Sequence, residues 1–139
     1  RKPELVLNSY KKKNKNYEFK DLGFQQLYEI YEFIYNRLGY FPLIIDADDL
    51  QNNPELTLRK LCNCLGIPFF ASMLNWSSGS KKYDGIWGVH WYEEINKTTG
   101  FSKSTSDNID KINKKISQKD KNIIERANRI YFKILENKI

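Results

Sequence analysis

The chain has 139 residues, 40% of them hydrophobic and 29% charged, which fits a globular protein and excludes an intrinsically disordered one. Lysine and arginine number 23 against 17 acidic residues, so the formal charge of +6 favours anionic partners, unless the lysines serve only solubility. One histidine and two cysteines disfavour a zinc site, and no run approaches the roughly 18 apolar residues of a membrane span. We expect a cytoplasmic protein that binds neither metal nor membrane.

The first predicted elements are a loop and a helix. Residues 11–16 (KKKNKN) form a basic polar run that is typical of a solvated loop. Apolar side chains then recur at spacings of three and four between Phe24 and Leu38, which predicts a helix. Asp21 is the candidate N-cap of this helix, and Gly39 is expected to end it.

A short strand and a second helix are predicted next. Residues 42–46 (PLIID) are apolar without alternation, which indicates a buried parallel strand. An Asn-Pro pair at the start and a glycine just past the end predict a helix over residues 53–65. Cys62 and Cys64 would point in different directions on that helix, so we expect buried thiols and no disulfide between them.

The remaining segments complete a mostly helical pattern. Residues 69–74 suit one short helical turn, and residues 76–106 show no clear period. Residues 117–139 carry an apolar face at helical spacing and predict a final helix. Because a lone strand leaves its backbone groups unpaired, we expect either that it pairs with a sheet outside this sequence or that the chain is mostly helical with a strand remnant. Both possibilities indicate a fragment of a larger α/β protein.

Three acids follow the predicted strand directly. Asp46, Asp48 and Asp49 lie where α/β sheets bind ligands, beyond the carboxyl end of a strand. Carboxylates at this position can bind a metal, act as a base or cap the following helix. Capping and hydrogen bonding to the loop are the commoner uses, so we favour the structural interpretation.

An aromatic loop is the most informative part of the sequence. Between Trp76 and Phe101 the chain holds all three tryptophans, the only histidine and two adjacent lysines. Large aromatic side chains are costly to leave in water, so the loop should pack onto the protein or cover a ligand. Packing is the commoner role for each tryptophan.

Arg1 and Ser9 are separated by eight residues. A guanidinium fork with a nearby hydroxyl suits a phosphate, because charged bidentate donors are combined with a neutral one. The spacing alone is weak evidence, because both residue types are common.

Together these motifs resemble the sulfotransferase-like P-loop family, especially a branch labelled aminotransferase-like in plants and bacteria. Arg1 followed by Ser9 is similar to the family's 3′-phosphate-binding motif. Later blocks follow in the family's order: IDADDL at 45–50, NPE at 53–55, LGIPF at 65–69, MLNW at 73–76, DGIW at 84–87, HWY at 90–92 and TGF at 99–101. The resemblance covers nearly the whole chain and is most specific in the aromatic loop.

The resemblance implies an α/β fold, the carboxyl-terminal part of a P-loop sulfotransferase-like domain. Over residues 1–139, taken as a single partial domain, it implies mostly helices with one or two parallel strands. It also implies a sulfuryl donor, 3′-phosphoadenosine-5′-phosphosulfate, and a small-molecule acceptor with a hydroxyl or amine. Arg1 and Ser9 would bind the 3′-phosphate of the nucleotide.

Further site residues come from the aromatic loop. Lys81 would also contact the nucleotide, although residues 82–84 (KYD) depart from the family's basic-glycine pattern. Trp87 would cover the adenine or shape the acceptor pocket by stacking, and His90 and Trp91 would line the acceptor site. No catalytic residue is assigned, because the family's base normally lies upstream of Arg1 and His90 is a weak candidate.

The family's 5′-phosphosulfate loop is not found in this sequence. In the family, its backbone amides and lysine hold the bridging phosphate and stabilise the leaving group. The segments at 79–82 (GSKK) and 100–103 (GFSK) lack the strand before and the helix after that such a loop needs. We expect the loop in a missing amino-terminal half of the same protein and expect this chain alone to be inactive.

Two other functions compete with the enzyme. A non-catalytic anion-binding or protein-interaction module of the same fold would also lack the phosphosulfate loop. A nucleic-acid binder is disfavoured, because the lysine runs at 11–15 and 111–121 are separated from the tryptophans. The sequence therefore favours part of a sulfotransferase-like enzyme, with the non-catalytic module as the alternative and no nucleic-acid partner.

Overall fold

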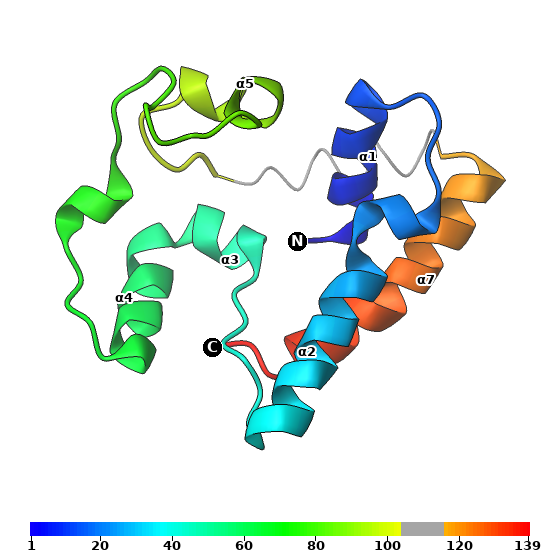
Figure 1. Ribbon diagram of the computed structural model, residues 1–139, viewed down its shortest axis with the longest axis horizontal. Coiled ribbons are helices and arrows are strands. Elements are labelled where there is room, and N and C mark those ends of the chain that lie inside the picture. The colour runs from blue at the N-terminus through cyan, green and yellow to red at the C-terminus, as the bar shows by residue number, and fades with distance from the viewer. Residues whose placement is uncertain (104–115) are drawn as a thin grey trace. The chain divides into compact units, whose positions relative to one another are not determined.

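The computed structural model describes residues 1–103 and 116–139 (Figure 1). The chain divides into two compact units, a first unit of residues 1–49 and 104–139 and a second unit of residues 50–103. The described helices are α1 (Pro3–Lys13), η1 (Phe19–Leu22), α2 (Phe24–Leu38), α3 (Ala47–Asn52), α4 (Pro54–Leu65), η2 (Ala71–Leu74), α5 (Gly88–Trp91), η3 (Ile95–Lys97) and α7 (Gln118–Leu135). None of these helices combines the length and the apolar character that crossing a membrane requires. The single partial domain expected over residues 1–139 stays a prediction.

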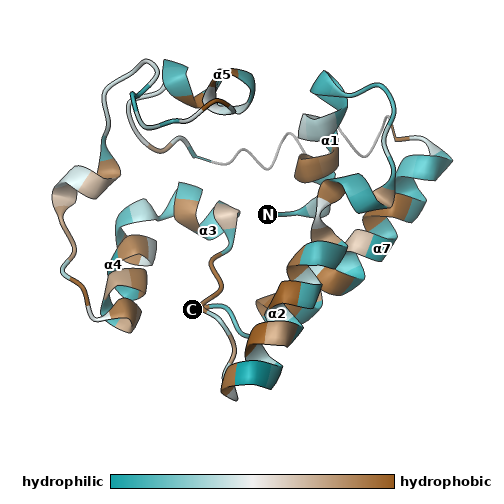
Figure 2. Ribbon diagram, in the orientation of Figure 1, coloured by the Kyte–Doolittle hydropathy of each residue, from teal (hydrophilic) through white to brown (hydrophobic). Residues whose placement is uncertain are grey.

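The first unit is built on three helices, with α7 packed against both α1 and α2 (Figure 1). Hydrophobic and hydrophilic residues alternate around α2 and α7 (Figure 2), so each helix has an apolar stripe to bury. The resulting core contains Leu7, Phe19, Phe24, Ile123, Ile124, Ala127 and Tyr131. The predicted final helix is confirmed as α7, whereas the sequence analysis missed α1.

Helix α1 corrects the expected loop at residues 11–16. Its last turn contains the lysines at 11–13, where cations interact favourably with the free carbonyl groups of the helix end. Of the run at residues 11–16, only residues 14–16 lie beyond the helix. Of the second lysine run, residues 111–115 lie outside the part of the chain that the structure describes.

A buried carboxylate holds the start of α7. Ser117 and Asp120 form a capping box, in which the Asp120 N–H donates to Ser117 Oγ at 3.1 Å. The Asp120 side chain also accepts hydrogen bonds from Lys11 Nζ and Tyr17 Oη, both at 2.7 Å. Burial alone would raise the pKa of Asp120, but the bonds from Lys11, Tyr17 and Ser117 outweigh it and lower the pKa to about 2. One carboxylate thereby joins α1, the connection after it and α7.

Helix α2 begins and ends where the periodicity predicts, and Gly39 ends it with a left-handed φ of 76°. The predicted cap at Asp21 is wrong. The Asp21 carboxylate accepts the Glu18 N–H at 2.8 Å and so caps the short helix η1 instead. Gly23, with a φ of 77°, then turns the chain into α2, and the start of that helix makes no side-chain capping bond.

The expected strand at residues 42–46 is present only as a remnant. Ile44 forms an isolated parallel bridge with Lys138, and the Ile139 N–H donates to the Ile44 carbonyl at 3.1 Å. An extended segment becomes a strand only when a neighbour pairs along its length, and one bridge does not provide that. Within the described residues the chain is mostly helical and has no strand, so the parallel sheet of the expected fold class is not confirmed.

The second unit contains α4, which matches the predicted helix over residues 53–65 and ends at Gly66 with a φ of 66°. Both cysteines are free. Cys62 is buried, with its sulfur 3.9 Å from the Met73 sulfur, as expected. The expectation of a buried thiol is wrong for Cys64, which faces solvent because residues two apart lie on different sides of a helix. The predicted short turn within residues 69–74 is confirmed as η2.

Candidate functional site

The carboxylates of Asp46, Asp48 and Asp49 form hydrogen bonds or ion pairs within the protein. Asp46 Oδ1 accepts the Asp48 N–H at 2.9 Å, and Asp46 Oδ2 accepts the Tyr131 hydroxyl at 2.7 Å. Asp48 pairs with Lys2 at 3.0 Å, and Asp49 pairs with Lys138 at 2.7 Å. Among the described residues, no group of three His, Cys, Asp or Glu side chains could hold a metal. The structural interpretation, for which the sequence favoured capping and hydrogen bonding to the loop, accounts for these contacts, and the structure adds the two ion pairs.

The buried Asp46–Tyr131 pair fixes the protonation of both groups. Burial alone would raise the pKa of Asp46, but the Tyr131 hydroxyl and the Asp48 N–H outweigh it and hold the pKa below its usual value. Burial and the hydrogen bond to Asp46 both raise the pKa of Tyr131. Asp46 is therefore an ionised acceptor at neutral pH, with the phenol as its donor.

Arg1 and Ser9 lie in the first unit, Arg1 just before α1 and Ser9 on it. Both residues are exposed. Within the described residues, the Arg1 guanidinium makes no ion pair and the Ser9 hydroxyl makes no hydrogen bond, whereas the neighbouring Lys2 is paired. Their hydrogen-bonding groups are thus available to an anion, roughly two helical turns apart.

Lys81 lies in the second unit, in the turn that precedes α5. Its ammonium donates to the carbonyl oxygens of Ser77 at 2.7 Å, Ser78 at 3.2 Å and Gly79. Its N–H donates to Asp84 Oδ2 at 2.6 Å. A lysine ammonium has three donors, so these contacts use all of them to hold the 77–81 turn.

Trp87, His90 and Trp91 lie together around the short helix α5. The rings of His90 and Trp91 meet edge to face, with centroids 4.6 Å apart. Trp87 is 68% exposed and Trp91 is 50% exposed. Neither tryptophan is buried in a core, so their rings remain accessible to a flat partner.

A pocket of about 360 Å³ lies elsewhere in the second unit, between residues 76–84 and 92–101. It is lined by Trp76, Gly79, Lys81, Tyr83, Asp84, Tyr92, Ile95, Asn96 and Phe101. We call it the Trp76 pocket. Among the six residues predicted to form the site, only Lys81 lines it.

Hydrogen bonds and ring contacts hold the walls of the Trp76 pocket. Trp76 Nε1 donates to Thr98 Oγ1 at 3.1 Å, and the rings of Trp76 and Phe101 meet edge to face at 5.2 Å. The Gly79 N–H donates to the Asn96 carbonyl at 2.7 Å, which joins the two segments. Residues 75 and 100, each next to a lining residue, form an antiparallel bridge. The walls are therefore fixed by the chain itself.

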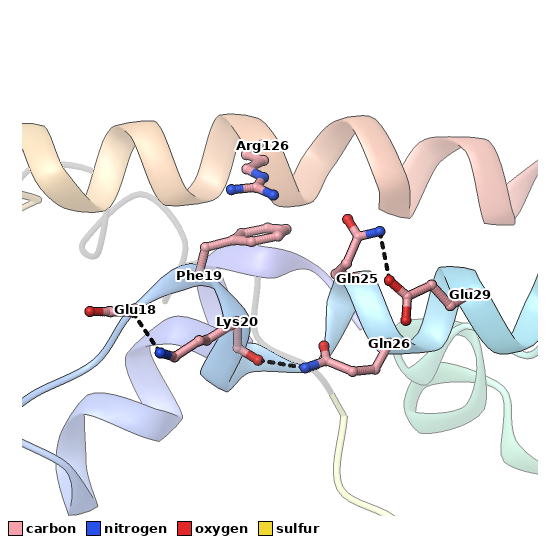
Figure 3. Close-up of a pocket in the computed structure, with 7 residues that line it drawn as sticks. All are labelled: Glu18, Phe19, Lys20, Gln25, Gln26, Glu29 and Arg126. Carbon is pink, nitrogen blue, oxygen red and sulfur yellow. Dashed lines mark hydrogen bonds and ion pairs between the residues drawn. The ribbon is translucent and has the colours of Figure 1, made fainter.

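A second, more polar pocket of about 420 Å³ lies in the first unit beside α2 and α7. Figure 3 shows the Arg126 guanidinium over the Phe19 ring, 3.9 Å from its centroid. Gln25 donates to Glu29 at 3.1 Å, and Gln26 donates to the Lys20 carbonyl at 3.0 Å. None of the six predicted site residues lies there.

The sequence analysis did not predict the Trp76 pocket as a site. Trp76, Tyr92 and Phe101 belong to motifs of the family resemblance, but of the residues that line the pocket only Lys81 was predicted as a site residue. The available signal was the two clusters of aromatic residues, separated by the residues that form α5. The sequence could not show that these clusters face each other, because their arrangement depends on hydrogen bonds between loops and not on a helical or strand periodicity.

Comparisons with known proteins place the chain in a family. A family model described as a sulfotransferase domain matches residues 1–119. Two proteins of Arabidopsis thaliana, named branched-chain-amino-acid aminotransferase-like proteins 2 and 1, are 47% and 44% identical over 102 residues. The matched segment is 73% of this chain, and it spans only 18% of the length of either relative. No solved structure matches the chain. Because the family model covers residues 1–119 of 139, the chain belongs to the sulfotransferase-domain family.

Proposed function

We propose that the chain is the carboxyl-terminal part of a domain that transfers a sulfuryl group from 3′-phosphoadenosine-5′-phosphosulfate to a hydroxyl or amine. The family match over residues 1–119 is the observation that carries the proposal. In this reaction class the acceptor oxygen or nitrogen bonds to sulfur, the bond from sulfur to the donor phosphate breaks, and the acceptor proton passes to a base.

Arg1 and Ser9 are proposed to bind the 3′-phosphate of the donor. Support comes from the availability of both groups, since the Arg1 guanidinium has no ion pair among the described residues. A guanidinium and a hydroxyl together supply charged and neutral donors to one phosphate. The lysine beside Arg1 is engaged with Asp48, which leaves Arg1 as the stronger candidate.

Lys81 and Trp87 are proposed as the other nucleotide contacts, with His90 and Trp91 at the acceptor. The Lys81 ammonium would have to exchange backbone carbonyls for phosphate oxygens, so its contribution should be smaller than that of Arg1. Trp87 has an exposed ring that could stack on adenine. The adjacent rings of His90 and Trp91 would bound the acceptor.

The chain by itself is not expected to transfer a sulfuryl group. Its sequence contains no glycine-rich loop that places a lysine and a hydroxyl between a strand and a helix. The extended segment at Ile44, with its single parallel bridge, would join the parallel sheet of a complete P-loop domain. Activity is therefore proposed only for the longer protein.

A non-catalytic anion-binding or protein-interaction module is the alternative. The Arabidopsis relatives carry aminotransferase-like names, and the present match covers only 18% of them. A module that had lost the phosphosulfate loop could retain Arg1 and Ser9 as a simple anion site. The two functions differ in whether the chain discriminates a nucleotide from inorganic phosphate.

Calorimetric titration with adenosine 3′,5′-bisphosphate tests the donor site. Arg1→Ala should weaken binding about 10- to 100-fold, since a charged hydrogen bond contributes about 1.5–3 kcal/mol. Lys12→Ala is the matched control, because it removes one exposed positive charge from the last turn of α1, away from Arg1, and should leave the affinity within about threefold. Equal losses in the two variants would indicate a general basic surface, and equal affinity for inorganic phosphate would favour the alternative.

A further inference from the structure

The polar pocket beside α2 and α7 in the first unit carries a separate inference (Figure 3). We call it the Arg126 pocket. Its volume of about 420 Å³ lies within the range of small-molecule sites. The charged residues among the described ones that line it are two cations, Lys20 and Arg126, and two carboxylates, Glu18 and Glu29. These charges cancel, which disfavours both a plain anion and a plain cation as the ligand.

The protein neutralises only two of these four charges. Lys20 Nζ lies 3.1 Å from Glu18 Oε2, so these two residues form an ion pair. Within the part of the chain that the structure describes, Arg126 and Glu29 form no ion pair, either with each other or with another residue. Glu29 accepts a hydrogen bond from the neutral side-chain amide of Gln25 at 3.1 Å. One unpaired cation and one unpaired carboxylate therefore line the same pocket.

The Arg126 guanidinium is positioned by an aromatic ring. It lies over the Phe19 ring at 3.9 Å from the centroid, and Phe19 is itself part of the buried core (Figure 3). A cation–π contact uses the flat face of a guanidinium and leaves the N–H groups at its edge able to donate. A carboxylate suits that edge, because its two oxygens accept two parallel N–H bonds. A doubly charged phosphate is disfavoured by the two carboxylates that line the pocket.

Acceptors for a cation lie on α2. Gln25 donates from its amide nitrogen to Glu29, and its amide oxygen receives no hydrogen bond from the residues that the structure describes. In Figure 3 this oxygen points toward α7 and away from Glu29. An ammonium group has three donors, so a carboxylate oxygen and a neighbouring amide oxygen can hold it together. The pocket thus offers donors for an anion and acceptors for a cation.

We propose that the Arg126 pocket binds a free α-amino acid as its zwitterion, with the carboxylate on the Arg126 guanidinium and the ammonium on the Glu29 carboxylate and the Gln25 amide oxygen. Such a ligand carries one charge of each sign and satisfies both unpaired groups at once. The inference is independent of sulfuryl transfer, because of the six residues proposed to bind the donor or the acceptor, none lines this pocket.

Titration with L-alanine, followed by NMR of the ¹⁵N-labelled chain, tests the proposal. The reporter is the side-chain amide signal of Gln25, which lines the pocket. The three tryptophan indoles serve as internal controls, because all of them belong to the second unit. We expect a saturable shift at Gln25 and little change at the indoles. A shift at Gln25 that does not saturate, or shifts of similar size at the indoles, would overturn the proposal.

Two smaller compounds test the need for both charges. Propionate is L-alanine without its ammonium group, and ethylamine is L-alanine without its carboxylate. Each should bind at least about tenfold more weakly than L-alanine, because each leaves one unpaired group of the pocket without a partner. Propionate that bound as tightly as L-alanine would show a plain anion site, and ethylamine that did so would show a plain cation site. Either result would overturn the proposal.

Arg126→Gln and Glu29→Gln remove the two unpaired charges one at a time. Each should weaken L-alanine binding about tenfold or more, and in Glu29→Gln the preference for L-alanine over propionate should fall below about threefold. Arg129→Gln and Glu32→Gln are the matched controls, because they remove the same charges from α7 and α2 outside the pocket. Both controls should leave the affinity within about twofold. If Glu29→Gln kept the wild-type preference, the assigned ammonium contact would be wrong.

Arg126→Lys separates ligand recognition from packing on the Phe19 ring. Lysine keeps a cation and an aliphatic stem at this position but lacks the guanidinium fork. Its affinity for L-alanine should therefore lie between those of wild type and Arg126→Gln, with helix content unchanged by circular dichroism. Equal affinities in Arg126→Lys and Arg126→Gln would show that the charge at this position is not used.

Competition with the nucleotide completes the test. Adenosine 3′,5′-bisphosphate should neither shift the Gln25 amide signal nor displace L-alanine, because Arg1 and Ser9 do not line the Arg126 pocket. Displacement of L-alanine by the nucleotide would overturn the assignment to a separate ligand, even if the donor site proposed at Arg1 proved correct. Failure of the nucleotide to bind anywhere would contradict the proposed function and leave the expected binding of L-alanine as it is.

Discussion

Replacing Asp120 by asparagine should destabilise the first unit and change its response to acid. The carboxylate is fully buried and accepts bonds from Lys11, Tyr17 and Ser117. Its pKa lies at about 2, below the ordinary value of 3.8, and this lowering corresponds to about 2 kcal/mol of stability at neutral pH. Asparagine keeps an acceptor for Tyr17 but places an amide or an uncharged oxygen beside the Lys11 ammonium. Including a weakened capping box, we expect a loss of about 2–3 kcal/mol at pH 7.

The pH dependence follows from the direction of the pKa shift. Because the folded-state pKa of Asp120 lies below its ordinary value, the stabilisation is fully present above about pH 5 and is lost as the pH falls through about 4 to 2. Asp120→Asn lacks this titration. The stability difference between wild type and variant should therefore shrink to less than about 1 kcal/mol near pH 2.

Urea unfolding followed by far-ultraviolet circular dichroism, at several pH values, provides the measurement. Glu125→Gln is the matched control, because it removes an exposed carboxylate that pairs with Arg129 on the same helix and should cost under about 0.5 kcal/mol. A cost for Asp120→Asn no greater than the control, or a difference that stays constant from pH 7 to pH 2, would refute the reasoning.

Three other predictions follow from the packing. Gly88→Ala should destabilise the second unit by about 1–3 kcal/mol and shift the tryptophan NMR signals, because a Cβ there would lie 2.7 Å from Asp84 Cβ; unchanged spectra would contradict this contact. Under native conditions a thiol reagent should modify Cys64 rapidly and Cys62 only after unfolding, and equal rates would show that Cys62 is not buried. Tyr131→Phe should cost about 1.5–3 kcal/mol at pH 7 by removing the donor to a buried carboxylate with a lowered pKa, and less near pH 3, where that carboxylate is more protonated. A cost for Tyr131→Phe that is the same at both pH values would contradict this coupling.

The longer helices α2, α4 and α7 were predictable, because a repeating apolar stripe is a local signal, as is a glycine stop. Helix α2 shows this at Gly39, as does α4 at Gly66. Helix α1 was missed because its lysine-rich last turn looks like a solvated loop. The helical state there depends on burying Leu5 and Leu7, which is a tertiary effect.

The strand and the pocket show where local patterns stop being informative. Residues 42–46 have the composition of a buried strand, but pairing requires a neighbour, and the described chain supplies one bridge. The Trp76 pocket arises from hydrogen bonds between segments about twenty residues apart. The acids at 46–49 were correctly interpreted as structural, because a carboxylate before a helix most often caps it.

The central claim, that this chain binds the 3′-phosphate of a nucleotide donor through Arg1 and Ser9, is tested by a two-ligand comparison. Adenosine 3′,5′-bisphosphate and adenosine 5′-monophosphate differ by that phosphate alone, so calorimetry on wild type and Arg1→Ala isolates its contact. We expect wild type to prefer the bisphosphate and Arg1→Ala to lose about 10- to 100-fold of that preference, with binding of the monophosphate unchanged. Equal preference in the two proteins, or no preference in wild type, would contradict the account.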